Sequence, residues 1–125
     1  MDNLPEPSSE KFRAYRLKLL DQLETSSQGE RNRARYELGL MRNSHFVSVG
    51  GLLHHYHDSG PANPVGTVLL IHGWDCWWMW WHRIIRELNA AGYRTVAYDM
   101  KGHGWTENDP ENRYHISDFA RDLDG

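Results

Sequence analysis

The stretch Thr67-Val-Leu-Leu-Ile-His-Gly-Trp-Asp75 decides how the middle of this chain folds. It begins with a continuous run of β-branched and aliphatic residues, Val68 to Ile71, which ends abruptly at His72-Gly73. A short apolar run bounded by turn residues is typical of a strand that is buried on both faces of a parallel sheet. We therefore predict a buried β-strand here, followed directly by a tight turn.

A helix and a second strand are predicted after this turn. Apolar residues recur there with the 3.6-residue period of an α-helix, at Trp77, Trp81, Ile84, Ile85 and Leu88. Asp75 or a neighbouring residue is placed to cap this helix, and Gly92 is placed to end it. The segment from Tyr93 to Met100 has the Thr, Val and Tyr side chains that favour a strand. Strand, helix and strand form a right-handed βαβ unit, and the loops after both strands meet at the sheet edge where such folds place their sites.

These segments resemble the amino-terminal half of an α/β-hydrolase. The similarity rests on Leu69-Leu-Ile-His-Gly-Trp74 and on Ala91-Gly-Tyr-Arg-Thr-Val-Ala-Tyr-Asp-Met-Lys-Gly-His-Gly104, and it extends from about His45 to Gly125. The fold class that it implies is α/β, with a β-hairpin, a βαβ unit and the start of a further helix. The resemblance identifies the superfamily rather than one of its members.

The chain is predicted to have two parts. Residues 1–44 are interpreted as a helical amino-terminal extension that packs on the main domain or on another chain, with a second helix at Glu30 to Met41. The apolar stripe of its first helix is formed by Phe12, Leu19, Leu20 and Leu23, with Arg16 as a gap. Residues 45–125 are interpreted as a partial α/β-hydrolase domain.

That domain is predicted to begin with a hairpin and to end with a helix. The strand patterns at residues 45–49 and 52–57 are joined by Gly50-Gly51, which favours a two-residue turn. A helical stripe then runs from Ile116 to Leu123, with Ser117 or His115 at its cap.

Composition restricts the function classes. The 125 residues include a single cysteine, Cys76, and carry a formal net charge of −3, which argues against a nucleic-acid partner. One cysteine excludes an internal disulfide and fits a reducing compartment. The first residues lack a signal-peptide pattern, and no apolar run approaches the length of a membrane span. We expect a cytoplasmic protein with a small-molecule substrate and no cofactor.

The His72-Gly73-Trp74 turn is the main candidate site. Acyl transfer needs preorganised N–H donors aimed at the developing oxyanion. The resemblance implies that the backbone N–H of Trp74 is one of these donors, because α/β-hydrolases take one from the loop after this strand. Gly73 is expected to allow a sharp turn beside a ligand. The side chains of Trp74 and Trp78 are expected to contact an apolar substrate, with a domain interface or plain surface exposure as the alternative.

Five histidines are candidates for other roles. His54, His55 and His57 suggest a metal site, in which His55 and His57 would share one face of the strand. Apart from the adjacent Asp58, no third ligand has a recognisable spacing, so strand histidines at the surface or half-buried are favoured and no metal is expected. In the α/β-hydrolases neither His72 nor His103 is the catalytic base, so both are interpreted as structural.

The string Gly-x-Ser-x-Gly, which carries the nucleophile in serine α/β-hydrolases, does not occur in this sequence. The chain is therefore expected to be a truncated hydrolase of carboxylic esters or similar small apolar substrates, inactive alone, and able to self-associate through an exposed sheet edge. Apart from a remnant without function, two alternatives remain open. One is a non-catalytic module that binds through its Trp-rich face. The other is an epoxide hydrolase or dehalogenase-like protein, although Asp75 stands where such relatives commonly carry proline.

Overall fold

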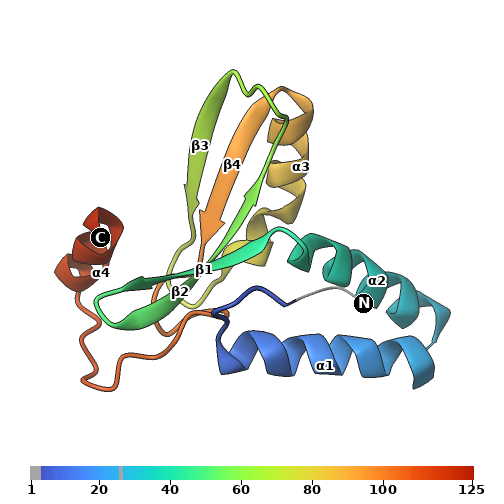
Figure 1. The fold of residues 1–125 in the computed structure, drawn as a ribbon, viewed down its shortest axis with the longest axis horizontal. Coiled ribbons are helices and arrows are strands. Elements are labelled where there is room, and N and C mark those ends of the chain that lie inside the picture. Colours follow the sequence, from blue (N-terminus) through green and yellow to red (C-terminus); the bar gives the residue numbers. More distant parts are fainter. Residues whose placement is uncertain (1–3, 26) are drawn as a thin grey trace.

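The computed structural model describes residues 4–25 and 27–125 (Figure 1). Its elements are, in chain order, α1 (Glu10–Thr25), α2 (Gln28–Met41), β1 (Ser44–Val49), β2 (Leu52–Ser59), β3 (Gly66–Ile71), the 3₁₀ turn η1 (Trp78–Trp81), α3 (His82–Ala90), β4 (Tyr93–Tyr98) and α4 (Ile116–Asp124). No helix in these described ranges is long and apolar enough to cross a bilayer.

The four strands form one mixed sheet with the order β1-β2-β4-β3. The pairs β1/β2 and β2/β4 are antiparallel, and β3/β4 is parallel. Gly50 and Gly51 form the β1–β2 turn with φ values of 59° and 81°, a conformation that favours glycine. The predicted hairpin, βαβ unit and α/β fold class are therefore confirmed.

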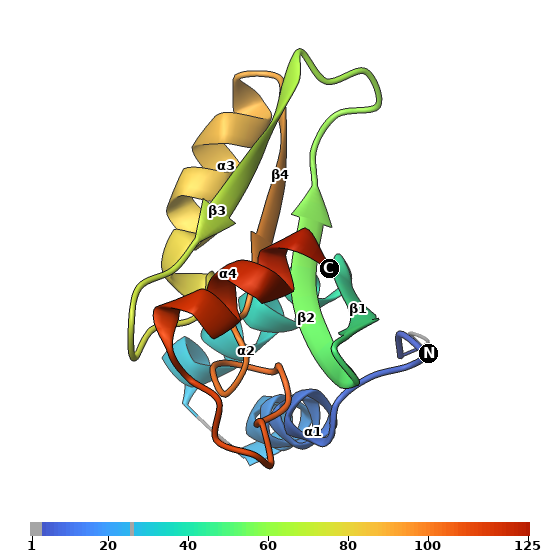
Figure 2. The same ribbon diagram turned by 90° about the vertical axis from the view of Figure 1, so that its left-hand side faces the viewer.

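Helices lie on both sides of the sheet. Helix α3 packs along β4 on one side, and α4 crosses the other side near β2 (Figure 2). Residue His115 occupies the N-cap of α4, and its backbone N–H donates to the carboxylate of Asp118 at 3.0 Å. The last helix therefore begins at the residue that the sequence predicts, with His115 rather than Ser117 at its cap.

The prediction that β3 is buried on both faces is wrong for the described chain. Leu70 is buried, but the side chains of Leu69 and Ile71 are 50% and 43% exposed. The physical reason is that α3 covers only one face, while β3 is an edge strand in this sheet. Its second face and its free edge are both open.

The helix after the turn also starts later than predicted. Asp75 has a φ of 60° and does not cap it; η1 comes first, and Trp81 is the N-cap residue of α3. The Trp78 backbone N–H donates instead to the side chain of Asp99. This long-range hydrogen bond holds the start of the segment in a shape that differs from a regular α-helix.

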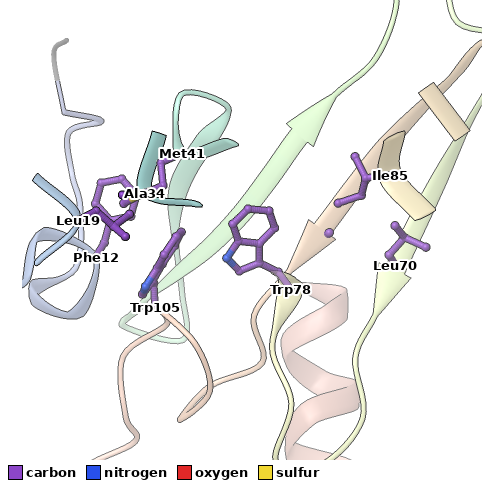
Figure 3. Packing of buried hydrophobic residues seen from close by; sticks show 9 residues of the cluster. Phe12, Leu19, Ala34, Met41, Leu70, Trp78, Ile85 and Trp105 are labelled. Carbon is purple, nitrogen blue, oxygen red and sulfur yellow. The ribbon is translucent and has the colours of Figure 1, made fainter. Parts of the chain in front are cut away.

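The amino-terminal helices pack onto the rest of the chain. Ser9 accepts a hydrogen bond from the Phe12 N–H at the start of α1, and Ser27 accepts one from Glu30 at the start of α2. In Figure 3, side chains from α1 and α2 gather at one end of the core and Leu70 and Ile85 at the other, with Trp105 and Trp78 between them. The core therefore runs continuously from the helices to the sheet.

Candidate active site at the turn after β3

His72 joins the loops that follow β3 and β4. Its Nδ1–H donates to the carbonyl of Gly73 at 2.8 Å, and its Nε2 accepts the Met100 N–H at 3.0 Å. Burial lowers the pKa of His72, which fits this neutral tautomer. Because both ring nitrogens are engaged, His72 positions the turn and has no free nitrogen with which to act as a base.

His103 makes a similar connection from the second loop. Its Nδ1 lies 3.0 Å from the Lys101 carbonyl, and its Nε2 accepts the Asp75 N–H at 3.2 Å. The imidazoles of His72 and His103 have ring centroids 5.1 Å apart. Together these contacts hold the backbone on both sides of Trp74.

The backbone of Trp74 remains available at this turn. Among the residues that the structure describes, its N–H has no hydrogen-bond acceptor. Gly73 is exposed and has no positive φ, and a Cβ at that position would meet no heavy atom within 4 Å. Gly73 therefore does not have the left-handed backbone conformation that would require glycine, and the expectation for this residue is wrong. Asp75 has that conformation instead. Because Gly73 has no side chain, the space beside the Trp74 N–H is open.

A hollow of about 300 Å³ opens next to the turn. It is lined by His72, Gly73, Cys76, Trp80, Trp81 and Ile84. Trp80 is 69% exposed, so its indole can contact a bound molecule. The hollow is mainly apolar apart from His72, which suits a small apolar substrate.

The two tryptophans predicted to contact substrate have different places. Trp74 is 71% exposed and makes an edge contact with His103 at a centroid distance of 5.4 Å. Trp78 is fully buried, stacks on His57 at 4.7 Å and contacts Trp105, so it belongs to the core. This corrects the prediction for Trp78. Trp80 lines the hollow instead, because η1 turns Trp78 inward towards Asp99.

Asp99 organises the backbone around both loops. Its fully buried carboxylate accepts the N–H groups of Trp78 at 2.8 Å and Trp105 at 3.0 Å, and the Nδ1–H of His55 at 2.9 Å. A Cβ on Gly104 would lie 2.3 Å from this carboxylate, so glycine is required there. The predicted structural role of the loop from Asp99 to Gly104 thus has a definite origin.

The strand histidines are more buried than predicted. His54, His55 and His57 are all buried rather than at the surface or half-buried. Burial lowers the pKa of His55, and its neutral ring accepts from the Ser44 hydroxyl at Nε2, 2.8 Å away. The contact joins a histidine that faces inward from β2 to Asp99 at the end of the neighbouring strand β4. Residue spacing in the sequence does not show that these two side chains meet.

The connectivity of Ser44, His55 and Asp99 is that of a Ser-His-Asp relay. All three side chains are buried within an aromatic core, with the ring of His55 against Trp105 at 4.8 Å. The trio therefore ties β1, β2 and the loop after β4 together. Within residues 4–25 and 27–125, no three His, Cys, Asp or Glu side chains come together in a group that could hold a metal ion.

Comparison with known proteins agrees with this architecture. The family model described as the alpha/beta hydrolase fold matches residues 66–124. Bifunctional epoxide hydrolase 2 of Rattus norvegicus is 37% identical over 79 residues, which cover 63% of this chain and 11% of that protein.

Two solved structures are also similar. The thioesterase domain from the curacin biosynthetic pathway has a TM-score of 0.60 at 30% identity, over 65% of this chain and 30% of that one. Epoxide hydrolase VrEH1 from Vigna radiata has a TM-score of 0.56 at 33% identity, over 64% of this chain and 26% of that one.

These similarities cover only part of the sequence, and the chain spans less than a third of the length of each of these three proteins. Over residues 66–124, the sequence matches the α/β-hydrolase superfamily. The recognition made from the two loop motifs is thereby confirmed.

Proposed function

We propose that the turn after β3 supplies one oxyanion donor, the backbone N–H of Trp74, to a serine-type hydrolase of carboxylic esters or similar small apolar substrates. The observation that carries this proposal is the free N–H of Trp74 beside an open hollow. A preorganised donor of this kind stabilises the charge that develops on a carbonyl oxygen without having to reorganise during the reaction. The hydrogen bonds of His72 and His103 keep the turn in place.

The walls of the hollow support an apolar substrate. Trp80 and Ile84 offer apolar surface, and the exposed indole of Trp74 stands on the same turn. An acyl or aryl group can stack on such rings while its carbonyl oxygen faces the N–H. The similarity to a thioesterase domain agrees with acyl chemistry at this position.

A second candidate, epoxide or carbon–halogen bond hydrolysis, is favoured by the names of the relatives, two of which are epoxide hydrolases. In such a reaction an aspartate nucleophile would form an ester on the enzyme, and hydrolysis of that ester again develops an oxyanion. The same N–H donor therefore serves both reactions. The nucleophile, serine or aspartate, decides between them.

Catalysis is proposed to need segments beyond these 125 residues, because they contain no Gly-x-Ser-x-Gly string and span only a fraction of the relatives. Residues 1–44 are proposed as an extension of the hydrolase domain formed by residues 45–125. We also propose a cytoplasmic location, from the single cysteine, and self-association of the isolated chain through the free edge of β3.

The first experiment is an assay of the purified chain with p-nitrophenyl acetate. We expect no turnover above that of a heat-denatured control. In parallel, the nucleotide sequence after the codon for Gly125 is read in all frames for a Gly-x-Ser-x-Gly string or for the same string with Asp in place of Ser. Turnover by the chain alone that depends on Gly73 would contradict the proposed need for further segments.

If such a string is found, the extended protein is assayed with an ester and with an epoxide. Trp74→Pro removes the N–H donor and should lower kcat by about 10²–10³. Trp74→Ala is the matched control, since it removes the indole and keeps the N–H. Equal activity of the Pro and Ala variants would rule out the donor role of Trp74.

A further inference from the structure

A second and larger hollow lies between the amino-terminal helices. Its volume is about 720 Å³, within the usual range of small-molecule sites. It is lined by Leu4, Pro5, Phe12, Arg16, Leu20, Leu23, Arg35, Leu38, Gly39, Met41, Arg42, Ser44 and His45. None of these residues lines the hollow at His72, so the two hollows are distinct.

The inner surface of this helical hollow is apolar. Phe12, Leu20 and Leu23 come from one side of α1, where their spacing brings them onto neighbouring turns of the same face. Leu38 and Met41 come from α2. Phe12 and Met41 are buried, whereas the leucines are partly exposed towards the hollow. A hydrocarbon chain is the group that gains most free energy from such a surface.

The polar lining is cationic. Among the residues that the structure describes, it includes Arg16 of α1, Arg35 of α2 and Arg42 just after α2, and no Asp or Glu. Arg16 has no hydrogen bond or ion pair with any other described residue, and the contact found for Arg35 is a weak one of 3.4 Å to Asn32. The chain as a whole has a net charge of −3, so this concentration of positive charge is local. Guanidinium groups beside an apolar surface match a ligand with one anionic end.

We propose that the hollow between α1 and α2 binds an apolar carboxylate of the fatty-acid class. Arg16 and Arg35 pair with the carboxylate, and the alkyl chain lies on the apolar lining formed by α1 and α2. A carboxylate fits the forked geometry of a guanidinium group, and its single charge leaves the rest of the molecule free to be buried. The site does not depend on the function proposed for the turn after β3.

Gly39 provides a direct way to fill the hollow. It lies within α2 with an ordinary helical φ, and a Cβ there would meet nothing within 4 Å. Gly39→Leu should therefore place a side chain in the ligand's space without straining the backbone. Gly29→Leu is the matched control, because Gly29 lies on the same helix, has the same open surroundings and is absent from the lining.

The test is calorimetric titration of the 125-residue chain with dodecanoate below its micelle-forming concentration. We expect saturable one-site binding that Gly39→Leu weakens at least tenfold and Gly29→Leu leaves within twofold. The double variant Arg16→Gln/Arg35→Gln should also weaken binding at least tenfold. Its control, Lys18→Gln/Arg86→Gln, removes two exposed charges outside the lining and should have no effect.

The proposal is overturned by several results. One is the absence of saturable dodecanoate binding. Another is binding of uncharged dodecanol as tight as that of dodecanoate. A third is dodecanoate binding that neither Gly39→Leu nor Arg16→Gln/Arg35→Gln weakens. Binding to anionic phospholipid vesicles without binding to free dodecanoate would show a membrane surface site instead. Circular dichroism establishes that each variant is folded. If Gly39→Leu does not fold, the Arg16→Gln/Arg35→Gln variant still tests the site.

Discussion

Asp99 is the residue on which most of the loop geometry depends. Three donors converge on its buried carboxylate, from Trp78, Trp105 and His55. Through these contacts it links the start of η1, the loop after β4 and the middle of β2. A side chain that satisfies three buried donors stabilises the fold mainly because its loss would leave them all unpaired.

Replacing Asp99 should therefore strongly lower the free energy of unfolding. Each buried donor left without an acceptor costs about 1–3 kcal/mol, so Asp99→Ala should cost at least about 3 kcal/mol. Asp99→Asn should cost less, because its amide oxygen still accepts. Urea unfolding measures both, with Asp124→Ala as an exposed control that should stay within about 0.5 kcal/mol. A loss below 1 kcal/mol for Asp99→Ala would show that other contacts hold the loops.

His57 makes the stability depend on pH. Burial, followed by the nearby His55, lowers the pKa of His57 from 6.5 to about 4 in the folded chain. As pH falls below 6.5 the unfolded chain binds the proton first, so stability is complete above 6.5 and falls progressively towards pH 4. This one group contributes up to about 3 kcal/mol, and the lowered pKa values of His55 and His72 act in the same direction.

Urea midpoints at pH 7.5, 5.5 and 4.5 measure this effect. His57→Phe keeps a ring to stack on Trp78 but cannot be protonated, so its midpoint should fall less over the same range. If the variant and the original chain lose stability in parallel, protonation of His57 is not the cause.

At the scale of elements, β3 is the exposed part of the sheet. One edge of β3 pairs with β4, and no other strand of the described residues pairs with its second edge. Leu69 and Ile71 add exposed apolar side chains on its open face. A strand with a free edge and an apolar face is a template for pairing with another chain.

We predict that the chain associates through β3 and that Leu69→Lys weakens this association. A lysine side chain on an edge strand opposes edge-to-edge pairing, because its charge would have to be held beside the apolar side chains of the incoming strand. Sedimentation velocity over a range of concentrations measures the change. Val47→Lys is the control on β1, the other edge strand, where an exposed valine is replaced in the same way. A purely monomeric original chain would contradict the prediction, as would an equal effect of both variants.

At the scale of the whole molecule, the amino-terminal helices are part of the core. The ring centroid of Phe12 lies 5.1 Å from that of Trp105 and 5.3 Å from that of Phe46. The ring centroids of Tyr15 and Trp77 are 5.7 Å apart. Lys11 Nζ also donates to the Thr106 carbonyl at 2.9 Å. Helix α1 is therefore packed on β1 and on the loop that Asp99 organises.

Phe12→Ala should therefore destabilise the whole chain rather than the helix alone. Truncating a buried phenylalanine costs about 3–5 kcal/mol. Leu17→Ala on the exposed side of α1 should cost no more than about 0.5 kcal/mol. Thermal unfolding followed by far-ultraviolet circular dichroism and by tryptophan fluorescence compares the two. If Phe12→Ala melts the helices while the fluorescence transition stays unchanged, the extension is an independent unit.

The sequence by itself determined the hairpin, the βαβ unit and the superfamily. These depend on turn glycines, on side-chain period and on the spacing of two loop motifs, which all act between residues close together in the chain. Tertiary structure alone decided that Trp78 is a core residue and that Trp80 lines the hollow. That choice depends on a hydrogen bond to Asp99, 21 residues further along, which overrides the helical period.

Tertiary structure also decided how exposed β3 is. An apolar run has the same sequence whether helices cover one face of a strand or both, so burial depends on which elements the chain brings against it. Here α3 covers one face, and Leu69 and Ile71 remain open on the other.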